Sequence, residues 1–244
     1  MANYTSDYSF KINGKSSDDF GIFVSTLQPV PHAQQRYTTG YTREPFGIPD
    51  DVFEPISYGI DFYKFFPEDM DDSALRAFLV NGQTMQLSTY PDVYFKILTM
   101  NVTETSGTAD NKRINYHLSF TLKPFRYGLD NDWITLESGD TVENVGTWYS
   151  KPIIELTRPN GDIIITINTT DYELKGLTNS GEQELTDSDI TYVDTSRLIV
   201  YNGKNELIIG ADNGRLPQLE VGENVISWTG NVERVRIRTN WREI

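Results

Sequence analysis

The sequence predicts a mainly β protein of two domains, and three observations support that prediction. Many short segments alternate apolar and polar residues, as strands with one buried face do. Turn signals such as Asn13-Gly14 and Asn202-Gly203 separate these segments at short intervals. The length of 244 residues allows two domains of common size.

The predicted boundary between the domains lies around Pro124 and Gly128. Residues 114–122 alternate apolar and polar side chains and predict a half-buried strand. Proline lacks the N–H that a sheet ladder needs and glycine permits a turn, so we expect this strand to end here. The first domain, a β-sandwich with one short helix, is predicted at residues 1–129, and the second at residues 130–244.

In the first domain, strands are predicted at residues 8–12, 20–24, 56–63 and 93–98. The helix has an apolar face at i, i+3 and i+4, namely Leu75, Phe78 and Leu79, and Asn81-Gly82 ends it. Asp71, Asp72 and Ser73 are its candidate caps. We interpret Asp69, Asp71 and Asp72 as capping residues; a calcium site is the alternative, although the regular spacing of an acidic calcium loop is missing.

Two polar segments of the first domain are predicted as loops. Residues 32–51 show little periodicity and indicate a long loop or an irregular hairpin. Residues 103–112 are predicted to join two strands of a hairpin. Long loops are often functional, so Arg36 and Arg43 in the first of them are candidate protein-contact residues.

The second domain is predicted to be all strand and turn. Its predicted strands are residues 153–156, 163–167, 190–193, 198–201, 207–209 and 224–228. Ile163, Ile165 and Ile167 share one face of their strand. Short strands with regular turns predict an antiparallel sandwich or jelly roll.

The last strand carries a stripe of arginines. Arg234, Arg236 and Arg238 lie on one face, and Val235 and Ile237 lie on the other. We favour a solvated face that acidic cross-strand neighbours neutralise. The alternative is a stripe that docks an acidic partner protein, so the three arginines are also candidate protein-contact residues.

Composition excludes several classes of function. The formal net charge is −14: the chain up to Gly128 has 11 Lys and Arg against 15 Asp and Glu, and the rest has 10 against 20. Stable binding to nucleic acid or to an anionic membrane needs clustered cations, so neither is expected. Cys is absent. We see no signal peptide and no apolar run that could span a membrane, and expect a soluble protein made in a cytoplasm.

The sequence offers no catalytic, metal or cofactor site. His32 and His117 are its two histidines, and no phosphate-binding glycine motif is present. A glycosidase needs only two carboxylates, but no pair stands out among the 35 acidic residues. The four tryptophans, Trp133, Trp148, Trp228 and Trp241, could stack sugars or pack internally, and we favour packing. We therefore expect no enzyme.

A series of short motifs runs in order along nearly the whole chain. The motifs are YSFKING at 8–14, DFGI at 19–22, YPDVYF at 90–95, KPFRY at 123–127, NVGTWYSKP at 144–152 with IIEL at 153–156, LEVGENVISW at 219–228 and NWR at 240–242. In this order they resemble one protein family, the distal tail proteins (Dit) of siphophages that infect Gram-positive bacteria.

The resemblance implies a structural baseplate hub in the virion, at the tip of the tail. It implies an N-terminal domain that forms a hexameric ring through which DNA passes, and a C-terminal galectin-like β-sandwich. It also implies three kinds of partner: the major tail tube protein, the tail-associated lysin or fibre protein, and receptor-binding or other baseplate proteins. Galectins bind sugar through a strand-borne histidine, which residues 130–244 lack. A carbohydrate-binding module or adhesin that recognises cell-wall sugar is the alternative function.

Overall fold

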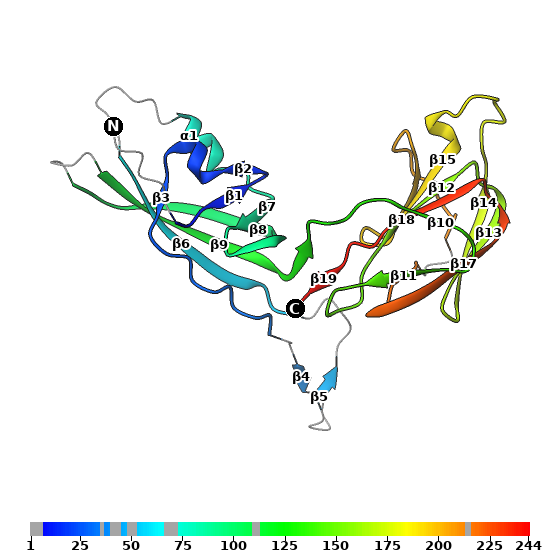
Figure 1. Ribbon diagram of the computed structural model, residues 1–244, viewed down its shortest axis with the longest axis horizontal. Helices are drawn as coiled ribbons and strands as arrows, with labels where there is room; N and C mark the ends of the chain where they lie inside the picture. Colours follow the sequence, from blue (N-terminus) through cyan, green and yellow to red (C-terminus); the bar gives the residue numbers. More distant parts are fainter. Residues whose placement is uncertain are drawn as a thin grey trace. The chain divides into compact units, whose positions relative to one another are not determined.

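The computed structural model describes residues 7–34, 37–39, 45–47, 53–65, 73–108, 113–212 and 216–244. It is mainly β, which confirms the predicted fold class (Figure 1). The chain divides into two compact units, one of Met1–Leu129 with Ile244 and the other of Asp130–Glu243. The roles predicted for the two parts, ring domain and galectin-like sandwich, stay predictions.

The first unit is built on one antiparallel sheet with the strand order β2-β1-β7-β8-β9-β6-β3 (Figure 1). Its strands are β1 (Phe10–Ile12), β2 (Lys15–Ser16), β3 (Phe23–Val24), β6 (Ile56–Phe65), β7 (Thr84–Leu87), β8 (Tyr90–Thr108) and β9 (Arg113–Gly128). The remaining elements are a 3-10 helix, η1 (Ser17–Phe20), the helix α1 (Ser73–Phe78), and the paired strands β4 (Tyr37–Thr39) and β5 (Pro45–Gly47).

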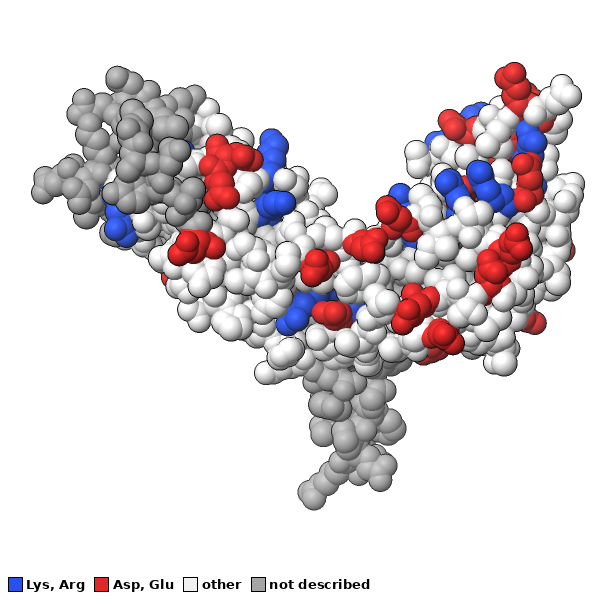
Figure 2. Space-filling view, in the orientation of Figure 1, with Lys and Arg blue, Asp and Glu red and all other residues white. Residues whose placement is uncertain are grey.

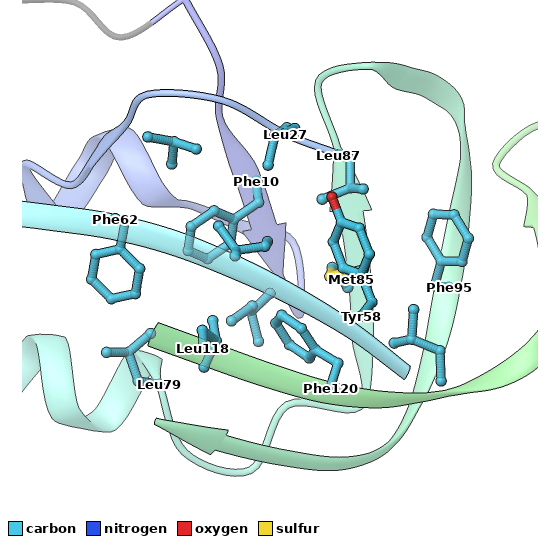
Figure 3. Close-up of a cluster of buried hydrophobic side chains, with 14 of the residues drawn as sticks. Phe10, Leu27, Tyr58, Phe62, Leu79, Met85, Leu87, Phe95, Leu118 and Phe120 are labelled. Atoms are coloured by element: carbon cyan, nitrogen blue, oxygen red, sulfur yellow. The ribbon is translucent and has the colours of Figure 1, made fainter. Parts of the chain in front are cut away.

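This sheet curls so that its two halves face each other across the core. Phe10 on β1 and Phe62 on β6 lie four strands apart in the sheet, yet their ring centroids are 6.1 Å apart. In a flat sheet they would lie roughly 19 Å apart, because neighbouring strands are about 4.8 Å apart. Tyr8 also bridges to Val24 on the last strand of the sheet. Figure 3 shows the buried side chains that fill the space between the two halves.

The predicted helix is confirmed as α1, with Leu75 and Phe78 buried on it and Leu79 buried just after it. Phe78 stacks on Phe20 of η1, with ring centroids 4.3 Å apart. Asn81 follows with a φ of 62°, a left-handed conformation that asparagine tolerates at the end of a helix. The candidate caps Asp71 and Asp72, and Asp69 with them, lie outside the described residues.

Three local predictions for the first unit were wrong. Residues 103–108 belong to strand β8, because their backbone continues the ladder with β9 as far as the pair Thr108 and Arg113. Strand β9 does not end at Pro124 but continues to Gly128. Pro124 is tolerated because the β8–β9 pairing shifts register between Phe95 and Ile97, opposite Pro124, and proline fits at such irregularities.

The third correction concerns the strand predicted at residues 20–24. Phe20 closes η1, and Gly21 caps that helix with a φ of 61°, so only Phe23 and Val24 remain as strand β3. His117 is a sheet-face residue, as predicted: it lies on β9, and its Nδ1 is 2.7 Å from Oδ1 of Asp61 on β6.

The second unit is a sandwich of two antiparallel sheets, ordered β10-β18-β12-β15-β16 and β11-β17-β13-β14 (Figure 1). Its strands are β10 (Ile134–Leu136), β11 (Asp140–Asn144), β12 (Ile153–Thr157), β13 (Asn160–Ile167), β14 (Thr170–Leu177), β15 (Ile190–Asp194), β16 (Ile199–Asn202), β17 (Gly222–Asn231) and β18 (Arg234–Arg238). The unit also contains a 3-10 helix, η2 (Asp187–Asp189), and the short strand β19 (Arg242–Glu243), which belongs to neither sheet. Ile163, Ile165 and Ile167 are buried in its core, as their alternation predicts.

The strand predicted at residues 207–209 does not form. Leu207 makes one isolated bridge, to Tyr201, and Ile209 is 94% exposed. The side chain of Asn202 accepts hydrogen bonds from the backbone N–H groups of Lys204 and Glu206, which turns the chain after β16. The segment is therefore held beside the edge strand by its turn and is not part of the sheet.

Motifs from three parts of the sequence meet at one end of this sandwich. The side chain of Asn144 is buried and donates to the backbone carbonyls of Trp148 and Leu219. It also accepts a hydrogen bond from the backbone N–H of Gly146. A Cβ at Gly146 would lie 2.3 Å from the backbone oxygen of Arg242, so only glycine lets these segments approach so closely. Hydrogen bonds and close backbone packing thus hold residues 144–148, 219 and 242 together in the second unit.

We predict that Tyr58→Phe lowers the free energy of unfolding of the first unit by about 1 kcal/mol at neutral pH. The buried Tyr58 hydroxyl donates to the backbone oxygen of Gln28 at 2.8 Å, and the substitution leaves that oxygen without this donor. Urea unfolding followed by circular dichroism measures the change. Tryptophan fluorescence is the control, because all four tryptophans lie in the second unit.

The same substitution has a pH dependence. Burial, with a smaller contribution from Tyr90, raises the pKa of Tyr58 from 10.0 to about 12. The hydroxyl stays protonated in the folded protein up to a higher pH than in the unfolded chain, so its stabilising effect is complete below pH 10 and is lost as the pH rises toward 12. The stability gap between the wild-type protein and Tyr58→Phe should therefore narrow above pH 10. A gap that widens there would contradict this assignment.

Candidate protein-contact surface

The structure describes three of the five candidate protein-contact residues. Arg36 and Arg43 lie outside the described residues. Arg234, Arg236 and Arg238 lie on β18, on the face of the sheet that points away from the core. The alternating Val235 and Ile237 are buried in the sandwich, as the sequence predicts.

A row of paired residues crosses this outer face over all five strands of its sheet. From β10 to β16 the row consists of Thr135, Arg236, Glu155, Tyr192 and Tyr201. Each is the direct cross-strand neighbour of the next, the arrangement in which side chains on one face interact most strongly. The middle of the row joins an arginine, a carboxylate and two tyrosines.

Glu155 is the buried centre of the row, with 1% of its surface exposed. Both its carboxylate oxygens accept from Arg236, from Nε at 2.8 Å and from Nη2 at 2.5 Å. The hydrogen bonds from Arg236 to Glu155 raise the pKa of the arginine further above its ordinary value. Arg234 is more distant, with its Nη2 3.9 Å from the same carboxylate. The favoured interpretation, neutralisation by an acidic cross-strand neighbour, thus holds for Arg236.

Trp133 covers part of this face. Its ring lies 6.2 Å from that of Tyr192, although three strand spacings separate the start of β10 from β15. The two side chains must therefore lean toward each other over the strands between them. The guanidinium groups of Arg236 and Arg238 lie 5.3 and 4.5 Å from the centre of the Trp133 ring, within the range of cation–π attraction.

The two tyrosines extend this cover to the edge of the sheet. Tyr192 and Tyr201 are stacked with ring centroids 5.2 Å apart. Burial raises the pKa of each hydroxyl, and the nearby carboxylate of Glu155 adds to the effect at Tyr192 as that of Asp194 does at Tyr201. Both phenols are therefore neutral at physiological pH, and that of Tyr192 is hydrogen-bonded to Glu155.

Arg238 differs from its two neighbours on β18. Its Nε is buried without a hydrogen-bond partner. In the part of the chain that the structure describes, Arg238 makes no ion pair. Its guanidinium is held over Trp133 and contributes to the electrostatic environment of Tyr201. The structure thus separates the stripe into a paired arginine, Arg236, and one whose charge has no carboxylate partner.

We call this set of five side chains the arginine–aromatic layer; its members are Trp133, Tyr192, Tyr201, Arg236 and Arg238. Figure 2 shows Lys and Arg side chains gathered over the region of β10, β12 and β18, with Asp and Glu spread over the rest of the visible surface of this unit. The sequence identified the arginines by their alternation. It did not identify Glu155 or the tyrosines, whose place in the row depends on strand pairing across up to 81 residues of chain.

The other candidate residues are the four tryptophans and the possible metal ligands. All four tryptophans are half-buried, and Trp228 packs against the core of the second unit, which agrees with the favoured packing role. Among the described residues, no group of His, Asp and Glu is arranged to hold a metal ion. No helix among them is long and apolar enough to cross a membrane.

We predict that Arg236→Ala destabilises the second unit by about 3 kcal/mol, because it leaves the buried Glu155 carboxylate without its main partner. Arg234→Ala is the matched control and should cost less than about 1 kcal/mol, since that arginine is more exposed and more distant. Urea unfolding followed by tryptophan fluorescence measures both. Equal effects of the two substitutions would contradict the assigned pairing.

Comparison with known proteins identifies the fold. No protein-family model matches the sequence, and no curated protein matches it. Four chains of solved structures do match. One belongs to the crystal structure of the SPP1 Dit (gp 19.1) protein, described as a paradigm of hub adsorption apparatus in Gram-positive infecting phages. The two chains share 13% sequence identity at a TM-score of 0.61, over 95% of this chain and 98% of the other.

The chain has a Dit-like fold. The likeness runs over nearly the full length of both proteins, so it includes strands from both units. At 13% identity it concerns the fold and not the function. The structural likeness agrees with the resemblance of the ordered sequence motifs to the Dit family.

Proposed function

We propose that this protein is a structural hub at the distal end of a siphophage tail and has no catalytic role. The observation that carries the proposal is the Dit-like fold, matched over 95% of this chain and 98% of a phage hub protein. A match of that extent leaves little of either chain unaligned. The likeness therefore concerns the architecture of the whole chain and is not limited to one common type of β-domain. The ordered sequence motifs point to the same class of protein.

In this proposal the first unit assembles into a hexameric ring, and the second unit carries contacts to other tail components. The partners we propose are the major tail tube protein, the tail-associated lysin or fibre protein, and receptor-binding or other baseplate proteins. The protein would assemble in the cytoplasm of the host bacterium and reside in the virion. The acidic composition suits a ring through which DNA passes, because a basic channel would retain the DNA.

We predict that the purified protein forms a ring with a mass near six times 27.8 kDa. Native mass spectrometry or light scattering measures the mass, and negative-stain imaging checks for a central hole. A closed ring is the expected product when a head-to-tail contact repeats with a rotation that closes. A stable dimer or tetramer without a hole would contradict the hexameric hub. If the protein is monomeric, the same measurement is repeated in the presence of the tail tube protein, where a ring is then required.

A further inference from the structure

We propose that the arginine–aromatic layer is a docking surface for a protein partner that presents carboxylate side chains, with Arg238 as the residue that receives them. This inference deepens the hub proposal by naming a surface of the second unit and the chemistry of its partner. It rests on the proposed function for the expectation that a partner protein exists there. The surface itself follows from the side chains described above.

Arg238 is a charged side chain without a carboxylate partner among the described residues. A guanidinium has five N–H donors and stays charged at any physiological pH. Arg236 uses Nε and Nη2 on Glu155, whereas Arg238 has no ion pair among the described residues. The Nε of Arg238 is buried and out of a partner's reach, so its two Nη groups are the donors that it can offer. Trp133 fixes its position, so little side-chain entropy remains to be lost on binding. An arginine held in place with its charge unmatched is suited to a carboxylate brought by another molecule.

The side chains around Arg238 are of the types that protein interfaces use. Trp, Tyr and Arg are the residues most enriched among those that dominate the binding energy of protein interfaces, and the layer consists of these three types. The cross-strand row that holds Arg238 continues with Ile153, Asp194 and Ile199. The two isoleucines are half-buried, and Asp194 is buried with its carboxylate bonded to Ser196 and Arg197 of its own turn. Leu198, next to Ile199, is 69% exposed. The charged centre therefore has an apolar border that a protein partner could cover.

The charge of this face is opposite in sign to that of the second unit as a whole. Residues 130–244 contain 20 Asp and Glu against 10 Lys and Arg. On the outer face of β18, β12 and β15, by contrast, three arginines face two carboxylates, the buried Glu155 and Asp194. An excess of positive charge on a strongly acidic unit selects a partner whose contact residues are acidic, because a basic partner would meet repulsion at this face.

The geometry favours a protein over a sugar as the occupant. Sugars bind aromatic residues by stacking on an open ring face. Two guanidinium groups lie over the ring of Trp133, and Tyr192 and Tyr201 stack on each other. What the layer offers to an occupant is therefore the guanidinium of Arg238 together with ring edges, which match a carboxylate and the apolar side chains around it.

The test measures binding of a short capped peptide in which Glu and Val alternate, so that an extended chain presents all its carboxylates on one side. Fluorescence anisotropy of the labelled peptide is recorded with the full-length protein at low and at raised ionic strength. The expected result is salt-sensitive binding that Arg238→Ala weakens by at least about tenfold, the loss of one charge-assisted hydrogen bond. The affinity of Arg238→Lys for the peptide should lie between those of the wild-type protein and Arg238→Ala, because lysine keeps the charge but lacks the planar fork of arginine.

Two controls keep the test specific. Lys175→Ala removes the same charge from β14 in the other sheet, where Lys175 pairs with Glu173 at 3.1 Å, and should change binding less than twofold. A peptide with Gln in place of Glu should not bind. Melting temperatures of all variants identify a purely structural role, in which Arg238→Ala would lower stability and leave peptide binding unchanged. That result would overturn the proposal.

A galacturonate oligosaccharide serves as the competing ligand. If the oligosaccharide binds through Arg238 and the peptide does not, the surface recognises an acidic glycan and the proposal of a protein partner is wrong. If neither ligand binds, the docking surface is likewise refuted. The solution mass of each sample separates this result from the hub proposal. A hexameric ring without peptide binding refutes the docking surface alone, whereas a protein that binds the peptide but stays monomeric even with the tail tube protein refutes only the ring.

Discussion

One buried ion pair, between Glu155 and Arg236, organises the outer face of the second unit. A carboxylate in the middle of a sheet is costly to bury, and it is stable here because both its oxygens accept from a single guanidinium. That pairing fixes Arg236 against Trp133, and Tyr192 lies directly beside Glu155 on the next strand. The position of Arg238, and with it the proposed docking surface, depends on the same arrangement because Arg238 is held over the same tryptophan ring.

Much of the fold could be predicted from residue alternation, because the two-residue period of a strand is a local property. The alternation of Arg234 to Arg238 correctly assigned both faces of β18, and Leu75 and Phe78 correctly marked the helix. Local signals failed where the partner strand decides the outcome. Residues 103–108 look like a loop by composition but lie in β8, since β9 supplies a continuous ladder. Pro124 is tolerated inside β9 because the pairing shifts register opposite it, which a single sequence does not show.

The candidate site could be predicted only in part, for the same reason. The arginines were visible as a stripe, and Trp133 as one of four tryptophans. Their relation to Glu155, Tyr192 and Tyr201 depends on which strands pair and in what register. Only the structure distinguishes Arg236, which Glu155 neutralises, from Arg238, which has no carboxylate partner among the residues that the structure describes. The hub role draws on a different kind of information, the likeness of the whole fold to a phage hub protein, and the docking surface adds a specific contact to that role.

The central claim is that this protein is a component of a phage tail tip. The most direct test is electron microscopy of virus particles from the source of this sequence, with gold-labelled antibodies raised against the purified protein. The account predicts label at the end of the tail that is distant from the capsid, on particles with long tails. Label on the capsid, or protein that never associates with particles, would contradict it.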